Sequence, residues 1–330
     1  MKQKGLKTLI IATCLCLVGC SGGNTSSGST TEPTSGGDAE YTVGIIQLTT
    51  HVALDAATQG FKDVLNEELG DTVKIEYQDA AGDSATCNTI AAQYVSEGVD
   101  LIMANATPAL QAAASATGDI PILGTSITEY GVALDINDFN GVTGRNVSGT
   151  SDLAPLDQQA AMFDELLPEV KSIGILFCSA EPNSVYQSKV VQAALEAAGK
   201  TVKEFKFTDS NDVQAVTEAA SKEVEAFYIP TDNTAADCAE IINSVALPAG
   251  IPIIAGEEGI CRACGIATLS IDYYELGRVT GYMAVRILKD NEDVSAMPIE
   301  YFTNPVKKYD EDRCMELGVI VGEEYTKIED

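Results

Sequence analysis

Short apolar runs rich in β-branched residues alternate along the chain with segments whose apolar residues recur at helical spacing. The apolar runs predict strands at residues 41–48, 72–77, 100–104 and 120–125. The segments between them predict helices over 54–69 and 84–95. Repeated strand–helix units of this length are typical of a parallel, doubly wound α/β sheet.

The same pattern starts a second time further along the chain. The sequence VGII at 43–46 returns as IGIL at 173–176, and IPIL at 120–123 returns as IPII at 251–254. Between these landmarks, VD at 99–100 followed by TP at 107–108 returns as VE at 224–225 followed by TD at 231–232. Three landmarks in the same order predict two similar doubly wound lobes.

The connections between the lobes follow from the segments that do not fit one lobe. A polar segment at 146–152 predicts the first crossing, before a helix that starts near 157. The strong helical pattern at 274–289 follows a predicted strand at 265–271 and has no obvious place in the second lobe, so we expect it to return to the first. A chain that crosses more than once makes a hinge suited to closing on a bound molecule.

These crossings predict the domain organisation. Residues 41–148 plus about 272–300 form the N-terminal lobe, and residues 149–271 plus about 301–330 form the C-terminal lobe.

The first forty residues predict the cellular compartment. Three lysines precede an apolar run at 9–18 that is too short to cross a bilayer, which is typical of a signal peptide over 1–20. The sequence LVGCS at 17–21 resembles a bacterial lipobox, with Cys20 as the lipidated residue. Residues 21–40 are mostly Ser, Gly and Thr and predict a flexible tether. We therefore expect a body anchored by lipid at the extracytoplasmic face of the membrane; the alternative is an ordinary secretory leader.

Composition narrows the class of partner. Hydrophobic residues make up 45% of the 330 residues and charged residues 21%, which is typical of a globular protein. Lys and Arg number 20 against 49 Asp and Glu, and the formal net charge is −29. Because nucleic-acid affinity comes largely from neutralised phosphates, this charge excludes nucleic acid and favours a small molecule or a cationic partner.

Polar residues follow the predicted strands, where the carboxyl ends of the strands form the ligand crevice of an open α/β sheet. Hydroxyls and helix-start N–H groups suit a carboxylate, and an aspartate suits an ammonium, so the set fits a zwitterion. The alternative for each is a helix cap or turn residue. The candidates are Gln47, Thr49, His51, Thr107, Thr125, Ser126, Thr150, Ser151, Asp152, Asn183, Ser184, Thr231, Asp232, Asn233, Glu257, Glu258 and Asp272.

Catalytic and metal-binding signatures are missing from the sequence. His51 is the only histidine, and no Gly-x-Ser-x-Gly, Walker A, His-Glu-x-x-His or dinucleotide-binding loop accompanies it. We expect His51 to be a neutral residue of the binding site, with no catalytic residue, metal or cofactor. An anchored extracellular enzyme, the alternative from another class, would need His51 as its general base.

Nine cysteines are present, of which Cys14 and Cys16 belong to the predicted leader. Cys261 and Cys264 have the spacing of a metal or redox pair, but no second pair exists to complete a four-thiolate zinc site. A local disulfide between them is left open. The predicted small packed residues are Cys87, Cys178 and Cys238.

Several motifs, in order, resemble a family of lipoproteins that bind substrate for ABC transporters and are linked to tryptophan and other aromatic amino acids. The resemblance covers residues 41–321, and the pair Cys261 and Cys264 departs from it. The motifs are VGIIQL at 43–48, His51, ALD at 53–55, QGF at 59–61, ATPA at 106–109, NVSGTSD at 146–152, PTDN at 230–233 and IDYYELGR at 271–278.

The resemblance implies a class I periplasmic-binding-protein-like fold that clamps a ligand between its lobes. It also implies delivery of the ligand to a membrane permease driven by a cytoplasmic ATPase, and no catalytic activity. We expect a monomer. The residues that match the family's pocket are Gln47, His51, Thr107, Ser126, Ser151, Asp152, Asn183, Thr231, Asp232 and Asp272.

On this interpretation the ligand is an aromatic amino acid. Asp152, Asp232 or Asp272 would pair with its ammonium, while Ser151, Thr107 and backbone N–H groups would hold its carboxylate. A sugar, nucleoside or other organic solute is the alternative ligand, and the absence of Trp weighs mildly against a sugar. A lipoprotein that reports ligand to a membrane receptor is the alternative role.

Overall fold

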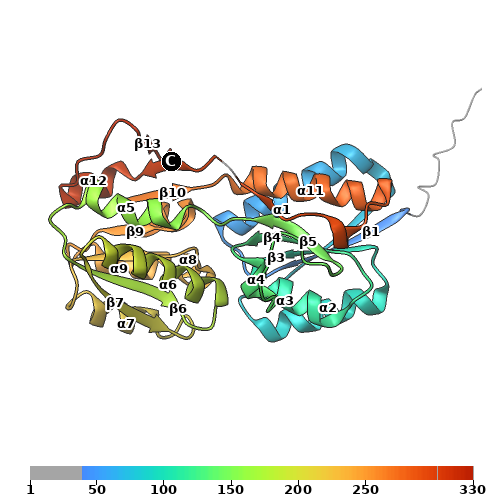
Figure 1. Cartoon of the computed structure of the whole chain (residues 1–330), viewed down its shortest axis with the longest axis horizontal. Coiled ribbons are helices and arrows are strands. Elements are labelled where there is room, and N and C mark those ends of the chain that lie inside the picture. The colour runs from blue at the N-terminus through green and yellow to red at the C-terminus, as the bar shows by residue number, and fades with distance from the viewer. Residues whose placement is uncertain (1–38, 303, 330) are drawn as a thin grey trace, which may run out of the picture. The chain divides into compact units, whose positions relative to one another are not determined.

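A computed structural model describes residues 39–302 and 304–329, so the predicted signal peptide, Cys20 and most of the tether lie outside the described residues. The described chain folds into two α/β lobes, each built on one sheet (Figure 1). Among these residues no helix is both long enough and apolar enough to cross a membrane.

The sheet of the first lobe has the strand order β11-β5-β4-β3-β1-β2, and all neighbours are parallel. Its strands are β1 (Tyr41–Gln47), β2 (Val73–Asp79), β3 (Leu101–Asn105), β4 (Ile122–Ile127), β5 (Val147–Ser151) and β11 (Glu300–Tyr301). Its helices are α1 (Val52–Leu69), α2 (Ser84–Glu97), α3 (Thr107–Ala116), α4 (Tyr130–Ala133) and α11 (Tyr273–Asp290), with short turns of 3-10 helix η1 (Gly70–Thr72) and η2 (Val294–Ala296).

The sheet of the second lobe has the order β13-β12-β10-β9-β8-β6-β7, in which only β12 runs antiparallel to its neighbour β10. Its strands are β6 (Ser172–Cys178), β7 (Thr201–Phe207), β8 (Ala226–Ile229), β9 (Ile253–Ala255), β10 (Ala267–Ser270), β12 (Val306–Tyr309) and β13 (Thr326–Lys327). Its helices are α5 (Leu156–Leu166), α6 (Pro182–Ala197), α7 (Val213–Ala220), α8 (Asn233–Asp237), α9 (Ala239–Ala246), α10 (Glu258–Cys264) and α12 (Glu311–Leu317).

Helices cover both faces of each sheet, which is why the central strands are apolar without alternation. In β1, Ile46 packs in a core with α2 and α3, while Val43 and Ile45 pack in a second core with α1 and α11. The fold class predicted from the sequence is therefore confirmed. The predicted strands of the first half correspond to β1–β4, and the predicted helices to α1 and α2, with ends that differ by a few residues.

One segment differs from its prediction. Residues 146–152 were expected to be a polar crossing, yet Val147–Ser151 form β5 inside the first sheet. The segment tolerates burial because its hydroxyls find partners: Ser148 Oγ donates to the Met297 carbonyl at 3.1 Å, and Thr150 Oγ1 lies 2.8 Å from Thr280 Oγ1. The chain leaves the first lobe only after this strand.

Helix α11 returns to the first lobe, as its pattern predicted, and packs along α1 (Figure 1). The two backbones touch at Gly60 and Gly277: a Cβ added at Gly60 would overlap the Tyr274 carbonyl, and one added at Gly277 would overlap the Ala57 carbonyl. Tyr274 also donates to Asp63 at 2.9 Å across this contact. The chain passes between the lobes after β5, after β10 and after β11.

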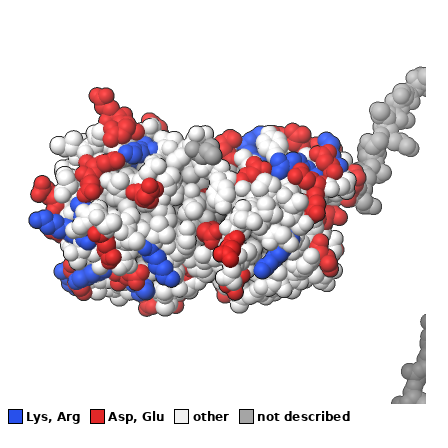
Figure 2. All heavy atoms as spheres, in the orientation of Figure 1, with Lys and Arg blue, Asp and Glu red and all other residues white. Residues whose placement is uncertain are grey.

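Charged side chains are spread over the surface of both lobes, with acidic and basic groups interspersed on the face drawn in Figure 2. Ion pairs such as Arg278 with Glu67, at 2.9 Å, lie on this exterior.

The close approach of α1 and α11 predicts the effect of a single methyl group. Gly277→Ala should lower the free energy of unfolding by about 1–3 kcal/mol, because the methyl group forces two backbones apart. Chemical denaturation measures the change. Gly118→Ala is the control, since nothing lies within 4 Å of a Cβ added there. Equal stabilities of the two variants would contradict the close packing.

Candidate functional site

A small cavity lies between the lobes at the carboxyl ends of the strands. The first lobe contributes the start of α1 and the end of β4, the second lobe contributes α6 and the segment after β8, and the hinge contributes Asp152 and Tyr273. Its volume is about 10 Å³, room for about one water molecule. The lining residues are His51, Ala53, Leu54, Ser126, Thr128, Asp152, Asn183, Thr231, Asn233 and Tyr273.

Unpartnered polar atoms gather in this cavity. His51 Nδ1, Ser126 Oγ, Asp152 Oδ1 and Asn183 Oδ1 are buried without a hydrogen-bond partner. Only three other side-chain atoms in the described residues share this state, and their residues lie outside the cavity lining. Since a buried polar atom without a partner costs about 1–3 kcal/mol, this concentration makes the cavity the candidate site for a polar group.

Asp152 is the carboxylate of the cavity. One oxygen, Oδ2, accepts a hydrogen bond of 2.9 Å from the Tyr273 hydroxyl, and the other has no partner. Burial raises the pKa of Asp152, and the hydrogen bond from Tyr273 opposes this shift. A cationic group against the free oxygen would stabilise the ionised form.

Ser126 is held in an unusual backbone conformation. Its φ is 55°, in the left-handed region that non-glycine residues avoid. The residue lies where the register between β4 and β5 shifts, between Gly124 and Ile127. Strain of this kind is typical of functional sites, where the surrounding structure maintains it.

His51 connects the two lobes. Its Nε2 lies 3.2 Å from Asn233 Oδ1, which can only accept a hydrogen bond. Nε2 therefore carries the proton, and in the neutral ring Nδ1 is an acceptor. Glu257 of the second lobe lies near enough to feel a charge on His51: burial raises the pKa of Glu257, and His51 acts in the opposite direction.

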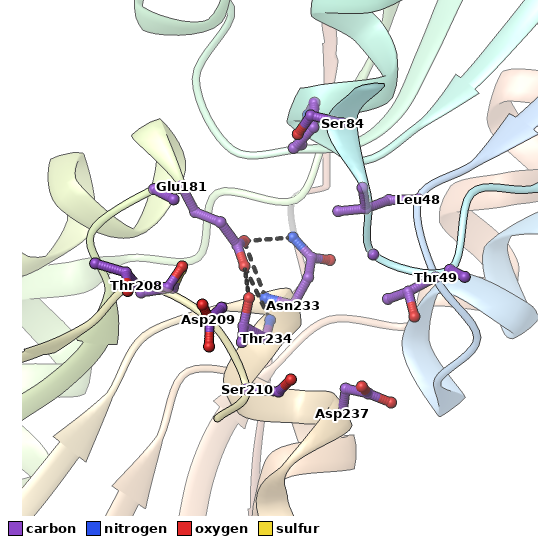
Figure 3. Close-up of a pocket in the computed structure, with 15 residues that line it drawn as sticks. Leu48, Thr49, Ser84, Glu181, Thr208, Asp209, Ser210, Asn233, Thr234 and Asp237 are labelled. Carbon is purple, nitrogen blue, oxygen red and sulfur yellow. Dashed lines mark hydrogen bonds between the residues drawn. The ribbon is translucent and has the colours of Figure 1, made fainter. Parts of the chain in front are cut away.

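A second cavity, drawn in Figure 3, shares Asn233 with the first in its lining. Its volume is about 170 Å³. The first lobe contributes Leu48, Thr49, Ala81, Gly82, Ser84 and Pro108, and the second contributes Cys178, Ala180, Glu181, Thr208, Asp209, Ser210, Asn233, Thr234 and Asp237. Apolar and hydroxyl groups are mixed in this lining with three carboxylates.

The structure brings together part of the set predicted from the sequence. His51, Ser126, Asp152, Asn183 and Thr231 line the small cavity. The other five do not line it. Gln47 bonds to Asp55 and Thr58, each at 2.6 Å, and Thr107 is buried at the start of α3.

The remaining three make local structural contacts. Ser151 Oγ donates to the Thr128 carbonyl at 3.0 Å. Asp232 accepts from the backbone N–H groups of Cys178 and Ala235, both at 2.7 Å, and burial together with the nearby Glu181 raises its pKa. Asp272 is an exposed cap of α11. For Asp232 and Asp272 the structure therefore shows the helix-cap role.

Residues outside the predicted ten also line the two cavities. Tyr273 was visible only as part of a motif, and Asn233 only as a strand-end residue, yet both line the small cavity. Glu181 was absent from the candidates although it follows β6 closely, which was the available signal. Its carboxylate makes the dashed bonds to Asn233 and Thr234 in Figure 3.

The cysteines have structural positions. All six cysteines of the described residues are buried free thiols, so the disulfide left open at Cys261 and Cys264 is not formed. Burial raises the pKa of the Cys264 thiol to about 12, which leaves it protonated and unreactive. Within residues 39–302 and 304–329, no group of three or more His, Cys, Asp or Glu residues is placed to hold a metal ion.

Comparison with known proteins identifies the family. The model of the ABC transporter substrate binding protein family matches residues 42–328, and the chain belongs to this family. The two-lobe architecture is the periplasmic-binding-protein-like fold, shared with solved binding proteins of much lower sequence identity. Membership assigns the chain to the binding proteins and not to the enzymes.

Individual relatives are similar over most of their length. A tyrosine-binding protein of Clostridioides difficile is 34% identical over 308 residues, which cover 91% of this chain and 88% of the relative. The structure of a Streptococcus pneumoniae ABC domain in complex with L-Trp is 32% identical with a TM-score of 0.83, covering 86% of this chain and 97% of that one. A ligand-free, open substrate-binding protein of Clostridium difficile with adhesive properties is 34% identical with a TM-score of 0.67, covering 87% and 99%.

Because the carboxylate of Asp152 is buried, replacing it should raise the free energy of unfolding by an amount that depends on pH. Because its pKa is raised in the folded state, folding retains a proton that the unfolded chain releases above about pH 4. Stability is therefore lost as the pH rises from there through the folded-state pKa. Asp152→Asn removes this loss and should raise the free energy of unfolding at pH 7 by about 1–3 kcal/mol.

Thermal unfolding between pH 4 and pH 8 measures this difference. Asp293→Asn, at an exposed cap of η2, is the control and should show no advantage that grows with pH. If the stabilities of Asp152→Asn and the wild-type protein changed with pH in parallel, the ionised form of Asp152 would not destabilise the folded protein.

Proposed function

We propose that this chain binds an aromatic amino acid between its lobes, as a lipid-anchored protein at the extracytoplasmic face of the cell membrane, and delivers the amino acid to an ABC permease. The observation that carries the ligand class is the set of unpartnered atoms in the small cavity. The tyrosine-binding relative and the relative in complex with L-Trp support the aromatic side chain.

The polar atoms match the two ends of a zwitterion. An ammonium has three N–H donors, and Asp152 Oδ1, Asn183 Oδ1 and His51 Nδ1 supply three acceptors. The Ser126 hydroxyl is free to donate to the ligand carboxylate. Paired with the ammonium, Asp152 would exchange an uncompensated buried charge for a charge-assisted hydrogen bond.

The small cavity has a volume of about 10 Å³, so the charged groups of an amino acid would fit only with the lobes slightly further apart, and its side chain needs further room. We place it toward the second cavity of about 170 Å³, which shares Asn233 with the first in its lining. Leu48 and Pro108 offer apolar contact to a ring, and Ser84 offers a hydroxyl group from the same lining. Release and entry would then require the lobes to separate, which breaks the His51–Asn233 contact.

A panel of ligands tests the proposal. Tyrosine, tryptophan or phenylalanine at one hundred times its Kd should raise the free energy of unfolding of the body without its leader by about 2.7 kcal/mol, and Asp152→Asn should weaken binding at least tenfold. Because the chain has no Trp, the fluorescence of added tryptophan reports its binding directly. The absence of a thermal shift with all three at millimolar concentration, or a shift with sugars or nucleosides instead, would refute the ligand class.

The anchor is tested separately. In the native host, Cys20→Ala should move the protein from the membrane fraction to the medium or the soluble extracytoplasmic fraction, since the acyl chains are attached at this residue. Ser21→Ala, beside it in the tether, should stay with the membrane. Retention of Cys20→Ala in the membrane fraction would contradict lipid attachment at this cysteine.

A further inference from the structure

Glu181 is a buried carboxylate between β6 and α6 whose hydrogen-bond partners are all neutral donors. It is the N-cap residue of α6, but its side chain makes no capping hydrogen bond to that helix. Oε2 accepts from the Asn233 backbone N–H at 3.1 Å and from Asn233 Nδ2 at 2.7 Å, and Asn183 Nδ2 lies 3.3 Å away. Oε1 accepts from the backbone N–H and the hydroxyl of Thr234, at 2.9 and 2.8 Å. Figure 3 shows this carboxylate directed at the start of α8.

This carboxylate determines which way two asparagine side chains face. An ionised carboxylate only accepts, so the NH₂ group of each amide must lie on the side of Glu181. For Asn183 a second acceptor, the Thr231 carbonyl at 3.0 Å, requires the same orientation. Both amide oxygens are then directed away from Glu181.

The orientation of the two amides determines which atoms face the small cavity, although Glu181 itself does not line that cavity. The oxygen of Asn233 meets His51 Nε2 at 3.2 Å, and the oxygen of Asn183 is buried in the cavity without a partner. If either amide turned over, an N–H donor would replace the acceptor. The cavity wall would then repel a cationic donor.

We propose that Glu181 is a positioning residue for ligand selection: by orienting Asn183 and Asn233 it makes the second lobe's side of the cavity an acceptor surface that selects ligands with a primary ammonium. This inference rests on the proposed binding of an amino acid. Glu181 acts through the two amides and does not itself contact the ammonium.

The test is Glu181→Gln, which has nearly the same shape but presents an NH₂ group that favours turning the asparagine oxygens toward it. Binding of L-tyrosine and of 3-(4-hydroxyphenyl)propionate, which lacks only the ammonium, is measured by calorimetry or by competition against tryptophan fluorescence. Glu181 also lines the cavity in which we place the ring, and both ligands carry that ring, so a direct effect on the ring would change both affinities alike. We therefore expect Glu181→Gln to weaken binding of tyrosine at least tenfold more than binding of the analogue.

A second glutamate serves as a control that separates an effect on the asparagine amides from a general loss of stability. Glu225 also accepts several hydrogen bonds, from the backbone N–H groups of Lys171 and Ser172 at 2.8 and 2.9 Å, at the opposite end of β6. Glu225→Gln should lower the melting temperature and leave the ratio of the two affinities unchanged. The proposal is overturned if Glu181→Gln weakens both ligands equally or leaves tyrosine binding intact.

A measurement without ligand keeps the inference independent of the proposed function. In wild-type protein and in Glu225→Gln, the side-chain NH₂ protons of Asn183 and Asn233 should exchange slowly with water and keep the same NMR shifts. In Glu181→Gln these resonances should move and lose protection; unchanged resonances would refute the positioning role. If the wild-type protein binds no aromatic amino acid, the proposed function fails while this result still decides how the amides are held.

Discussion

The contact between the backbones of α1 and α11 is the constraint on which the site depends. Both helices begin at the cleft, α1 directly after His51 and α11 with Tyr273. Because Gly60 and Gly277 let the helices touch without intervening side chains, the two starting points are held at a fixed separation. The Tyr273 hydroxyl then holds Asp152, at the start of the first crossing, by a hydrogen bond of 2.9 Å. One helix–helix contact thus orders groups from three distant parts of the sequence.

The lobes meet through polar groups, and this determines what the cleft can do. An apolar cleft would close by itself because burying its surface is favourable. Here closing buries atoms such as Asp152 Oδ1 and Ser126 Oγ without partners, which opposes closure. A ligand that supplies those partners would make the free energy of closing the cleft favourable. On the proposed function, binding energy and lobe closure would be coupled for this reason, and a complementary ligand would stabilise the closed form by its differential affinity.

The sequence predicted the parts of the fold that follow from apolar patterning. The runs that became β1–β4, and the helical pattern that became α11, bury apolar groups whatever their neighbours are. The strand β5 was missed because its Ser and Thr residues are buried through hydroxyl partners such as Thr280, far along the chain.

The residues of the candidate site were also predicted only in part. The strand-end rule placed His51, Asp152 and Asn183 in the cavity, because topology alone brings strand ends together. Residue type could not separate a helix cap from a side chain that lines the cavity. Asp152 and Asp232 are the same residue type, and only the structure shows that Asp232 accepts from two backbone N–H groups. Glu181 was missed because most of its hydrogen bonds come from Asn233 and Thr234, 52 and 53 residues further along the chain.

The single imidazole of the chain has a practical consequence. His51 is the only histidine, and it lies where the two lobes touch. Its ring protons therefore give one uncrowded set of magnetic resonance signals, without any label or engineered probe. The environment of that ring differs between a cleft in which Asn233 is adjacent and one filled with solvent. The chemical shifts of the His51 ring therefore report whether the lobes are in contact.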